Sequence, residues 1–229
     1  MEKKYIHQEV STGADTIAHL KLYDGSAFDY SLNNNYGTLK GTAHYTYPGV
    51  DLDGDSDYIE IADADDFSPV STSMSISAWI YRDDTSYFGI VTKSETNKDE
   101  WQFYVDLSNK VKFIVIDDSS EGYIGRKYNT ALSTGKWLHV VGTYENDATP
   151  TSADVKIYLN GAKVDDTDSE DNTFGDFVEV ENLGAPVWIG RLSASYSNGK
   201  IDDVIITKSV LSATEVRSIY ELTRWRYQV

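Results

Sequence analysis

Short β-rich segments, each bounded by clusters of Gly, Asn, Asp and Ser, follow one another along almost the whole chain. This pattern is typical of an antiparallel sandwich and differs from alternating strands and helices. Residues 74–81 alternate with a period of two, which places Met74, Ile76, Ala78 and Ile80 on one face of a strand. We expect that face to belong to the core.

Further segments rich in Val, Ile, Tyr, Phe and Trp are predicted to be strands. They run from Lys110 to Ile116, Trp137 to Tyr144, Asp154 to Leu159 and Val187 to Ile189. Asn160-Gly161 predicts a two-residue hairpin turn after the third of these, because both residue types tolerate positive φ. The polar, acidic stretch from Asp165 to Asp176 is predicted to be a long exposed loop.

One short helix is predicted near the C-terminus, starting near residue 213. Ser212 and Glu215 have the spacing of a capping box, in which each side chain accepts a hydrogen bond from the other residue's backbone N–H. Val216, Ile219 and Tyr220 then share one stripe at helical spacing. We expect this stripe to pack against the sandwich.

The composition supports a single domain over residues 1–229. Hydrophobic residues make up 40% of the 229 residues, which is enough for one sizeable core, and β-sandwiches reach this length as one domain. No internal repeat or second domain is evident. Residues 1–16 are interpreted as an N-terminal extension.

The charge balance argues against two classes of partner. Asp and Glu total 37 against 20 Lys and Arg, giving a formal charge of -17, which repels nucleic acid phosphates and anionic membranes. Solubility is the simplest explanation of this acidity, with a salty habitat or oxygen-ligated cations as alternatives. The absence of cysteine removes disulfides, zinc–thiolate sites and thiol nucleophiles.

The first residues lack the apolar stretch of a signal peptide, and no apolar window is long enough for membrane insertion, so neither is expected. A mature fragment of a secreted protein, or a component of a virion, would share these properties. The expected location is therefore extracellular, at a cell surface or in a virion.

The order of several short motifs resembles the laminin G-like jelly rolls of the concanavalin A-like lectin/glucanase superfamily. Each motif is weak by itself, but their order and spacing together are specific. The resemblance extends from about Leu20 to about Leu222. The motifs are D-G-S at 24–26, N-Y-G-T-L at 35–39, L-D-G-D-S-D-Y-I-E-I at 52–61, S-I-S-A-W-I at 75–80, G-K-W-L-H-V-V at 135–141, I-G-R at 189–191, G-K-I-D-D-V at 199–204 and L-S-A-T-E-V at 211–216.

This resemblance implies an all-β fold of two antiparallel sheets, with a ligand surface on the concave face or the rim loops. It also implies a structural calcium ion that ties an N-terminal loop to the last strand. Asp202 matches the family's ligand position, Asp24 and the carbonyl of Gly54 match its partners, and Asp29 is a spare candidate. The alternative for these acids is turn formation and solubility.

The sequence gives little support to catalysis. Glu179 and Glu181 would share one face of a strand, but the rest of the carboxylate motif of the related glucanases is missing, so a solvated strand face is the preferred interpretation. The Tyr and His motifs of the related lyases are also absent. His139 is interpreted as a structural strand residue.

Aromatic side chains with polar neighbours suit sugar rings, because C–H faces of sugars stack on π surfaces while polar groups bind the hydroxyls. With 17 Tyr and 5 Trp in the chain, most aromatic residues must be core or ordinary surface, and Trp79 and Trp137 are expected to pack in the sandwich. The candidate ligand residues are Tyr81, Tyr87, Trp101, Tyr104, Tyr123 and Tyr196, with Arg82 and Arg191 as polar partners.

The leading hypothesis is a non-catalytic, calcium-stabilised carbohydrate-binding domain that works in an oligomeric or multivalent assembly. The alternative is a structural or adhesion module of a virus particle or cell-surface protein, which binds protein partners. A polysaccharide-active enzyme with a cryptic site is third.

Overall fold

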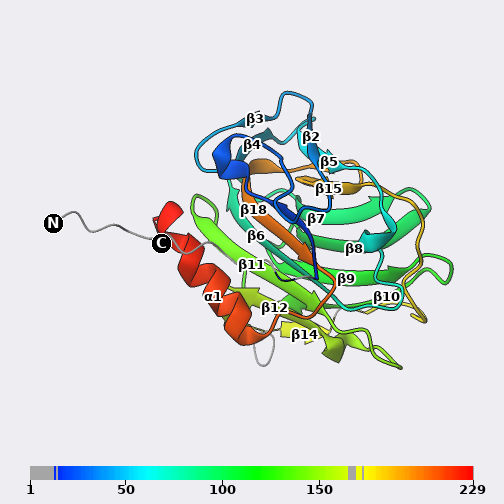
Figure 1. The fold of residues 1–229 in the computed structure, drawn as a ribbon. Coiled ribbons are helices and arrows are strands. Elements are labelled where there is room, and N and C mark those ends of the chain that lie inside the picture. The colour runs from blue at the N-terminus through cyan, green and yellow to red at the C-terminus, as the bar shows by residue number, and fades with distance from the viewer. Residues whose placement is uncertain (1–12, 14, 165–168, 172, 229) are drawn as a thin grey trace.

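The computed structural model describes residues 13, 15–164, 169–171 and 173–228, and it contains two apposed antiparallel sheets (Figure 1). Sheet A consists of β1 (Thr16–Leu20), β3 (His44–Tyr45), β4 (Val50–Asp53), β6 (Met74–Arg82), β11 (Trp137–Tyr144), β12 (Val155–Leu159), β13 (Ala162–Lys163) and β18 (Asn198–Thr207). Sheet B consists of β2 (Gly37–Lys40), β5 (Tyr58–Ile61), β7 (Phe88–Glu95), β8 (Lys98–Val105), β9 (Val111–Asp117), β10 (Gly122–Tyr128), β14 (Ser169–Asp171) and β15 (Val187–Ile189). The remaining elements are the hairpin β16 (Arg191–Leu192) and β17 (Ser195–Tyr196), the helix α1 (Ala213–Thr223), and the 3-10 turns η1 (Leu22–Asp24), η2 (Asp65–Phe67), η3 (Ser152–Asp154) and η4 (Arg224–Arg226).

The strand order joins segments that are distant in the sequence. Sheet A runs β13-β12-β11-β6-β18-β4-β3, with β1 also paired to β18, and sheet B runs β14-β10-β9-β8-β7-β15-β5-β2. The predicted all-β, two-sheet antiparallel sandwich with one short C-terminal helix is confirmed. No helix within the described part of the chain is long and apolar enough to span a membrane.

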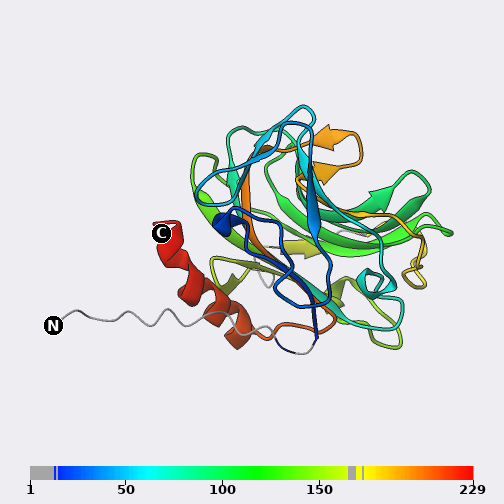
Figure 2. The same ribbon diagram turned by 45° about the horizontal axis from the view of Figure 1, so that its top comes forward.

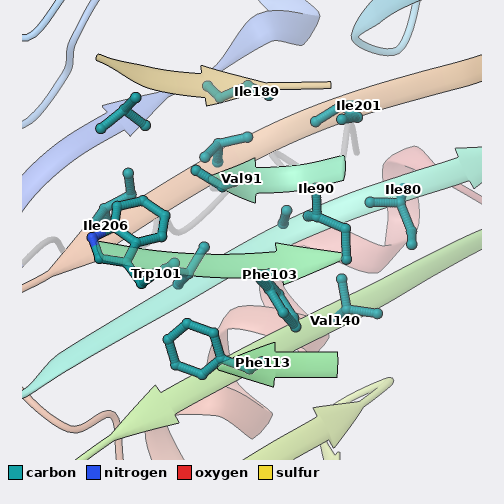
Figure 3. Close-up of a cluster of buried hydrophobic side chains, with 14 of the residues drawn as sticks. Ile80, Ile90, Val91, Trp101, Phe103, Phe113, Val140, Ile189, Ile201 and Ile206 are labelled. Atoms are coloured by element: carbon teal, nitrogen blue, oxygen red, sulfur yellow. The ribbon is translucent and has the colours of Figure 1, made fainter. Parts of the chain in front are cut away.

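The core lies between the two sheets, where alternate side chains of facing strands meet (Figure 3). Ile80 and Val140 of sheet A lie near Ile90, Phe103 and Phe113 of sheet B, and all five are buried. The face of β6 that was predicted to be core is buried as expected. Burial of such side chains stabilises the fold by about 1.5–3 kcal/mol each.

Helix α1 covers the outer face of sheet A, beside β11 and β12 (Figures 1 and 2). The predicted capping box is present, since Ser212 and Glu215 exchange hydrogen bonds. The predicted stripe is also buried: Val216 packs on Val141 of β11 and Tyr158 of β12. The helix therefore covers the part of this face formed by β11 and β12.

Trp79 and Trp137 are buried as predicted, but they do not lie between the sheets. They form a separate cluster on the outer face of sheet A with Tyr220 and Tyr227, and the rings of Trp79 and Tyr227 stack with centroids 4.0 Å apart. The indole of Trp79 donates to Thr223 of α1. The burial of Trp79 was predicted correctly, but its position was not. Alternation turns Trp79 away from the inward-facing residues of β6, and the C-terminal segment then covers it.

Several predicted boundaries need small corrections. The predicted strands at Lys110 and Asp154 each begin one residue later, because Lys110 ends the preceding turn and Asp154 belongs to η3. The hairpin at Asn160-Gly161 is confirmed, with φ of 50° and 76°.

Two predicted segments differ more from the structure. Within the stretch predicted as a loop, from Asp165 to Asp176, residues 169–171 form β14 and pair with β10. Residues 165–168 and 172, and the predicted N-terminal extension apart from residues 13, 15 and 16, lie outside the described residues. The segment 179–181 is irregular, not a strand.

Candidate ligand-binding site

The outer face of sheet B carries the candidate site. Strand β8 turns Trp101 and Phe103 into the core and presents Gln102 and Tyr104 on the opposite side. The strand register places Gln102 beside Ile114 of β9, so polar and apolar side chains share this outer face.

An open depression of about 350 Å³ lies on this face, across β8, β9 and β10. Ile114 and Ile116 of β9 contribute nearly buried apolar side chains, and Tyr104 and Tyr123 lie on the neighbouring strands. Burial raises the pKa of the Tyr104 hydroxyl, with nearby Tyr123 and Asp106 adding to the effect. We call this depression the groove. It is lined by Asp99, Gln102, Tyr104, Ile114, Ile116, Asp118, Glu121, Tyr123 and Phe174.

Phe174 reaches the groove from a distant part of the chain. Its backbone exchanges two hydrogen bonds with Tyr123, at 2.8 and 3.0 Å, and the two rings stack with centroids 5.9 Å apart. Phe174 is nevertheless 61% exposed. An exposed aromatic ring that the backbone holds in place is a suitable surface for a ligand.

The segment that follows Phe174, residues 175–186, is held by carboxylates to the end of β9 and the turn after it. The carboxylate of Asp117 accepts from the backbone N–H of Val178 at 3.0 Å, and that of Glu181 accepts from Ser119 at 2.9 Å. Burial alone would raise the pKa of Asp117, but hydrogen bonds from Val178 and neighbouring groups hold it below its usual value. Because Glu179 and Glu181 lie in this irregular segment, the predicted strand face does not form.

Polar groups surround the apolar floor of the groove. Gln102 donates to the Ser94 hydroxyl at 2.8 Å, and that hydroxyl donates to Asp99. Burial raises the pKa of Asp99, and the nearby charge of Asp118 acts in the same direction. The carboxylate of Asp118 in turn accepts from the backbone N–H of Asp99 at 3.2 Å. The groove thus offers hydrogen-bonding oxygens and an amide beside aromatic rings.

Two of the predicted ligand residues are inaccessible to a ligand. Trp101 is fully buried, and its indole donates to the carbonyl of Phe67 at 2.9 Å. Arg82 is also buried, and its guanidinium donates to Asn109 at 2.7 Å. Both predictions are wrong for the same reason: each residue alternates onto the inward side of its strand.

The other predicted ligand residues are divided among separate places. Tyr104 and Tyr123 meet in the groove. Tyr87 and Tyr196 line a second open depression of about 470 Å³, with the exposed side chain of Leu107. Tyr81 lies on sheet A, with its ring centroid 5.7 Å from that of Trp137.

Arg191 is engaged by aromatic rings near the second depression. Its guanidinium carbon lies 3.8 Å from the ring centroid of Trp188 and 4.8 Å from that of Tyr58. These two cation–π contacts fasten the β16–β17 hairpin to β15 and β5 of sheet B. Hairpin β16–β17 also lies close to β7, so close that a Cβ added at Gly89 would collide with the Arg191 backbone.

The sequence-based candidates omitted Phe174, Gln102 and Leu107. Phe174 had one usable signal, since it is the only aromatic residue between residues 165 and 176. Gln102 could have been found from its alternation with Trp101 and Phe103. Leu107 carries no comparable pattern.

The residue at the centre of the predicted calcium site is already satisfied by protein donors. Asp202 is fully buried, and one carboxylate oxygen accepts from the backbone N–H groups of Tyr23 at 2.9 Å and Asp203 at 2.7 Å. The other oxygen accepts from the Tyr227 hydroxyl at 2.7 Å. Burial, reinforced by the charge of Asp203, raises the pKa of Asp202 to about 7. A carboxyl that is held in this way is a poor calcium ligand.

The predicted partners of Asp202 do not gather around it. The carboxylate of Asp24 accepts from Ser26 and Tyr30, and that of Asp29 accepts from His19, Ser31 and Asn35. Gly54 faces Asn198 at the start of β18, whereas Asp202 lies further along that strand. Among the described residues, no group of three or more His, Asp or Glu side chains is arranged to hold a metal ion. The predicted donor set therefore does not fit calcium.

The buried acids next to this position fasten the C-terminus instead. Asp203 accepts from Arg226 of η4 and lies 2.8 Å from Nε2 of His19 on β1. Although burial opposes it, the contacts with His19 and Arg226 hold the pKa of Asp203 below its usual value. This cluster joins β1, β18 and η4.

Comparison with solved structures finds many similar folds. The receptor binding domain of a botulinum neurotoxin C/D mosaic serotype aligns with 91% of this chain at a TM-score of 0.69 and 20% identity. A second similar structure is domain 4 of AbnA, a GH43 extracellular arabinanase from Geobacillus stearothermophilus, solved in complex with arabinotriose. It aligns with 90% of this chain at a TM-score of 0.67 and 18% identity. The chain spans about half (51%) of the neurotoxin domain and 98% of the arabinanase domain.

Comparison with curated protein sequences finds no significant match. Comparison with family models matches residues 53–217 to the model of the concanavalin A-like lectin/glucanases superfamily. The match covers most of the sandwich, from the end of β4 into α1. The chain therefore belongs to the concanavalin A-like lectin/glucanase superfamily.

Proposed function

We propose that this chain is a non-catalytic glycan-binding module and that the groove on sheet B holds the oligosaccharide. The observation that carries the proposal is the arrangement of Tyr104, Tyr123 and the exposed ring of Phe174 around an apolar floor. Sugar rings present apolar C–H faces, which stack on aromatic side chains. The C-terminal segment covers much of the aromatic surface on the outer face of sheet A, whereas the groove on sheet B is open.

Polar groups in the groove suit the hydroxyls of a sugar. The carboxylates of Asp99, Asp118 and Glu121 are hydrogen-bond acceptors, and the amide of Gln102 can both donate and accept. An open groove with few hydrogen bonds supports dissociation constants of roughly micromolar to millimolar. Weak sites of this kind work best in a multivalent or oligomeric assembly.

The comparisons support binding of carbohydrate in a general way. The structure of the arabinanase domain contains arabinotriose, and a further similar structure concerns botulinum neurotoxin type C, whose cell entry is dependent upon interaction with two ganglioside molecules. The latter structure aligns with 90% of this chain at 16% identity and a TM-score of 0.62. An extracellular, cell-surface or virion location is part of the proposal, since AbnA is an extracellular enzyme.

A second candidate function is adhesion through a protein partner. Phe28, Tyr30 and Tyr36 are exposed and adjacent, with ring centroids 5.2 Å apart between Phe28 and each tyrosine. Aromatic clusters of this kind are enriched at protein interfaces. If the groove binds no glycan, this surface makes the structural or adhesion module the preferred function.

The direct test is calorimetric titration with arabinotriose, cellohexaose, laminarihexaose and lactose, together with an assay for released reducing ends. We expect Phe174→Ala to weaken binding by about 2- to 12-fold, which corresponds to the 0.5–1.5 kcal/mol of an aromatic contact. Phe28→Ala is the matched control, because it removes an exposed phenylalanine from another surface. Equal losses in both variants, or the release of reducing ends, would contradict the proposal.

A further inference from the structure

The groove contains acidic side chains without basic ones. Of the nine residues that line it, Asp99, Asp118 and Glu121 are acidic, and none is Lys, Arg or His. The remaining lining residues are aromatic, aliphatic or amide side chains. A ligand in this groove therefore meets negatively charged hydrogen-bond acceptors and, among these nine described residues, no opposing cation.

The basic side chains on the same face lie beside the groove. Lys112 of β9 faces Tyr104 of β8 on one side and Lys127 of β10 on the other. The ammonium group of Lys112 lies 3.0 Å from a carboxylate oxygen of Asp106 and 5.8 Å from the ring centroid of Tyr104. Its charge is thus already paired with a carboxylate.

From this charge distribution we propose that the groove selects uncharged oligosaccharides and rejects glycans that carry sialic or uronic acids. The inference rests on the proposed function, and it names the class of glycan. A carboxylate on the ligand would approach Asp118 and Glu121 without an arginine or lysine to receive it. The hydroxyls of a neutral sugar, in contrast, donate to these carboxylates.

The overall charge of the protein acts in the same direction. With a formal charge of -17, the chain repels an anionic ligand before contact is made. Repulsion between solvent-exposed charges is screened by salt, with a Debye length of about 10 Å at 0.1 M. Discrimination against acidic glycans should therefore be strongest at low salt.

The experiment compares neutral and acidic members of matched pairs by calorimetric titration of the full chain. The pairs are lactose with 3′-sialyllactose, and β-1,4-mannohexaose with the β-1,4-mannuronate hexasaccharide. At about 0.02 M NaCl we expect the acidic member to bind about tenfold more weakly or worse, and the difference should shrink at about 0.5 M NaCl.

A pair of variants separates the groove from the overall charge. Glu121→Gln removes one charge at the groove and should narrow the difference between neutral and acidic members. Asp15→Asn removes one charge next to β1 of sheet A and should leave the difference unchanged. The two variants change the net charge equally.

The outcomes distinguish this inference from the proposed function. Equal or tighter binding of the acidic members would overturn the selectivity and leave glycan binding intact. Equal effects of Glu121→Gln and Asp15→Asn, or no effect of either, would also overturn it, because the groove would then not be the cause. If no member of either pair and none of the neutral sugars binds at millimolar concentration, the proposed function and this inference both fail.

Discussion

Replacement of Lys93 by methionine should lower the free energy of unfolding by about 3–5 kcal/mol, because it leaves a buried carboxylate without its cation. Lys93 and Glu100 are both 0% exposed, and the ammonium nitrogen lies 2.9 Å from Oε1 of Glu100. The same ammonium group contacts Asp63 at 2.6 Å and donates to the carbonyl of Ala185 at 2.7 Å.

The size of the effect follows from what remains after the substitution. Glu100 would keep one hydrogen bond, from the backbone N–H of Leu183 at 2.9 Å, and water could not reach its charge. Asp63 contributes less, because its side chain is 34% exposed and can be rehydrated. The substitution would also remove the contact that fastens Ala185, in the segment that follows Phe174, to β7.

Urea denaturation of the wild type, Lys93→Met and the double variant Lys93→Met/Glu100→Leu measures this coupling. The double variant should regain much of the lost stability, since an apolar pair can replace a buried ion pair. Lys98→Met is the control: its partner is Glu95, both side chains are 44% exposed, and we expect a loss of at most about 1 kcal/mol. A loss below about 1 kcal/mol for Lys93→Met, or a double variant less stable than the single one, would refute the reasoning.

Two further predictions concern buried ionisable groups on sheet A. Because protein donors already occupy both oxygens of Asp202, we expect Asp202→Ala to lower the melting temperature by the same amount with and without a chelator. If a chelator lowers the melting temperature of the wild type but not that of Asp202→Ala, the calcium site is supported instead. Burial lowers the pKa of His139 to about 4, so the folded state binds fewer protons than the unfolded state between pH 6.5 and about 4. The free energy of unfolding should therefore decrease by on the order of 3 kcal/mol as the pH is lowered from 6.5 to about 4, and it should decrease less in His139→Gln. The raised pKa of Asp202 has the opposite effect on stability. Only the difference between the wild type and His139→Gln therefore reports on His139. Identical pH profiles would contradict this assignment.

The features that were predicted correctly depend on neighbours in the sequence. The inward face of β6 followed from alternation, the turn at Asn160-Gly161 from residues that tolerate positive φ, and the start of α1 from the spacing of Ser212 and Glu215. Each of these patterns spans fewer than ten residues. At these positions the local preferences of the sequence agree with the global fold.

The features that were missed depend on contacts between distant segments. Phe174 reaches the groove only because its backbone pairs with Tyr123, about fifty residues earlier in the chain. Asp202 was assigned to a metal because it matches the family's ligand position, and its burial beneath Tyr227 cannot be read from its neighbours in the sequence. The exposure of Trp101 was misjudged although the signal was present, since its alternation with Gln102 places it on the inward side.

The segment that covers each aromatic face of the sandwich determines how much of that face is exposed. The outer face of sheet A carries Trp79 and Trp137, and the C-terminal segment buries both with Tyr220 and Tyr227. The outer face of sheet B carries Tyr104 and Tyr123. The segment that approaches this face contributes Phe174, which is joined to Tyr123 by a single backbone bridge. Aromatic composition alone therefore does not distinguish the two faces. The C-terminal segment covers the aromatic residues of one face, whereas Phe174 adds an exposed ring to the other.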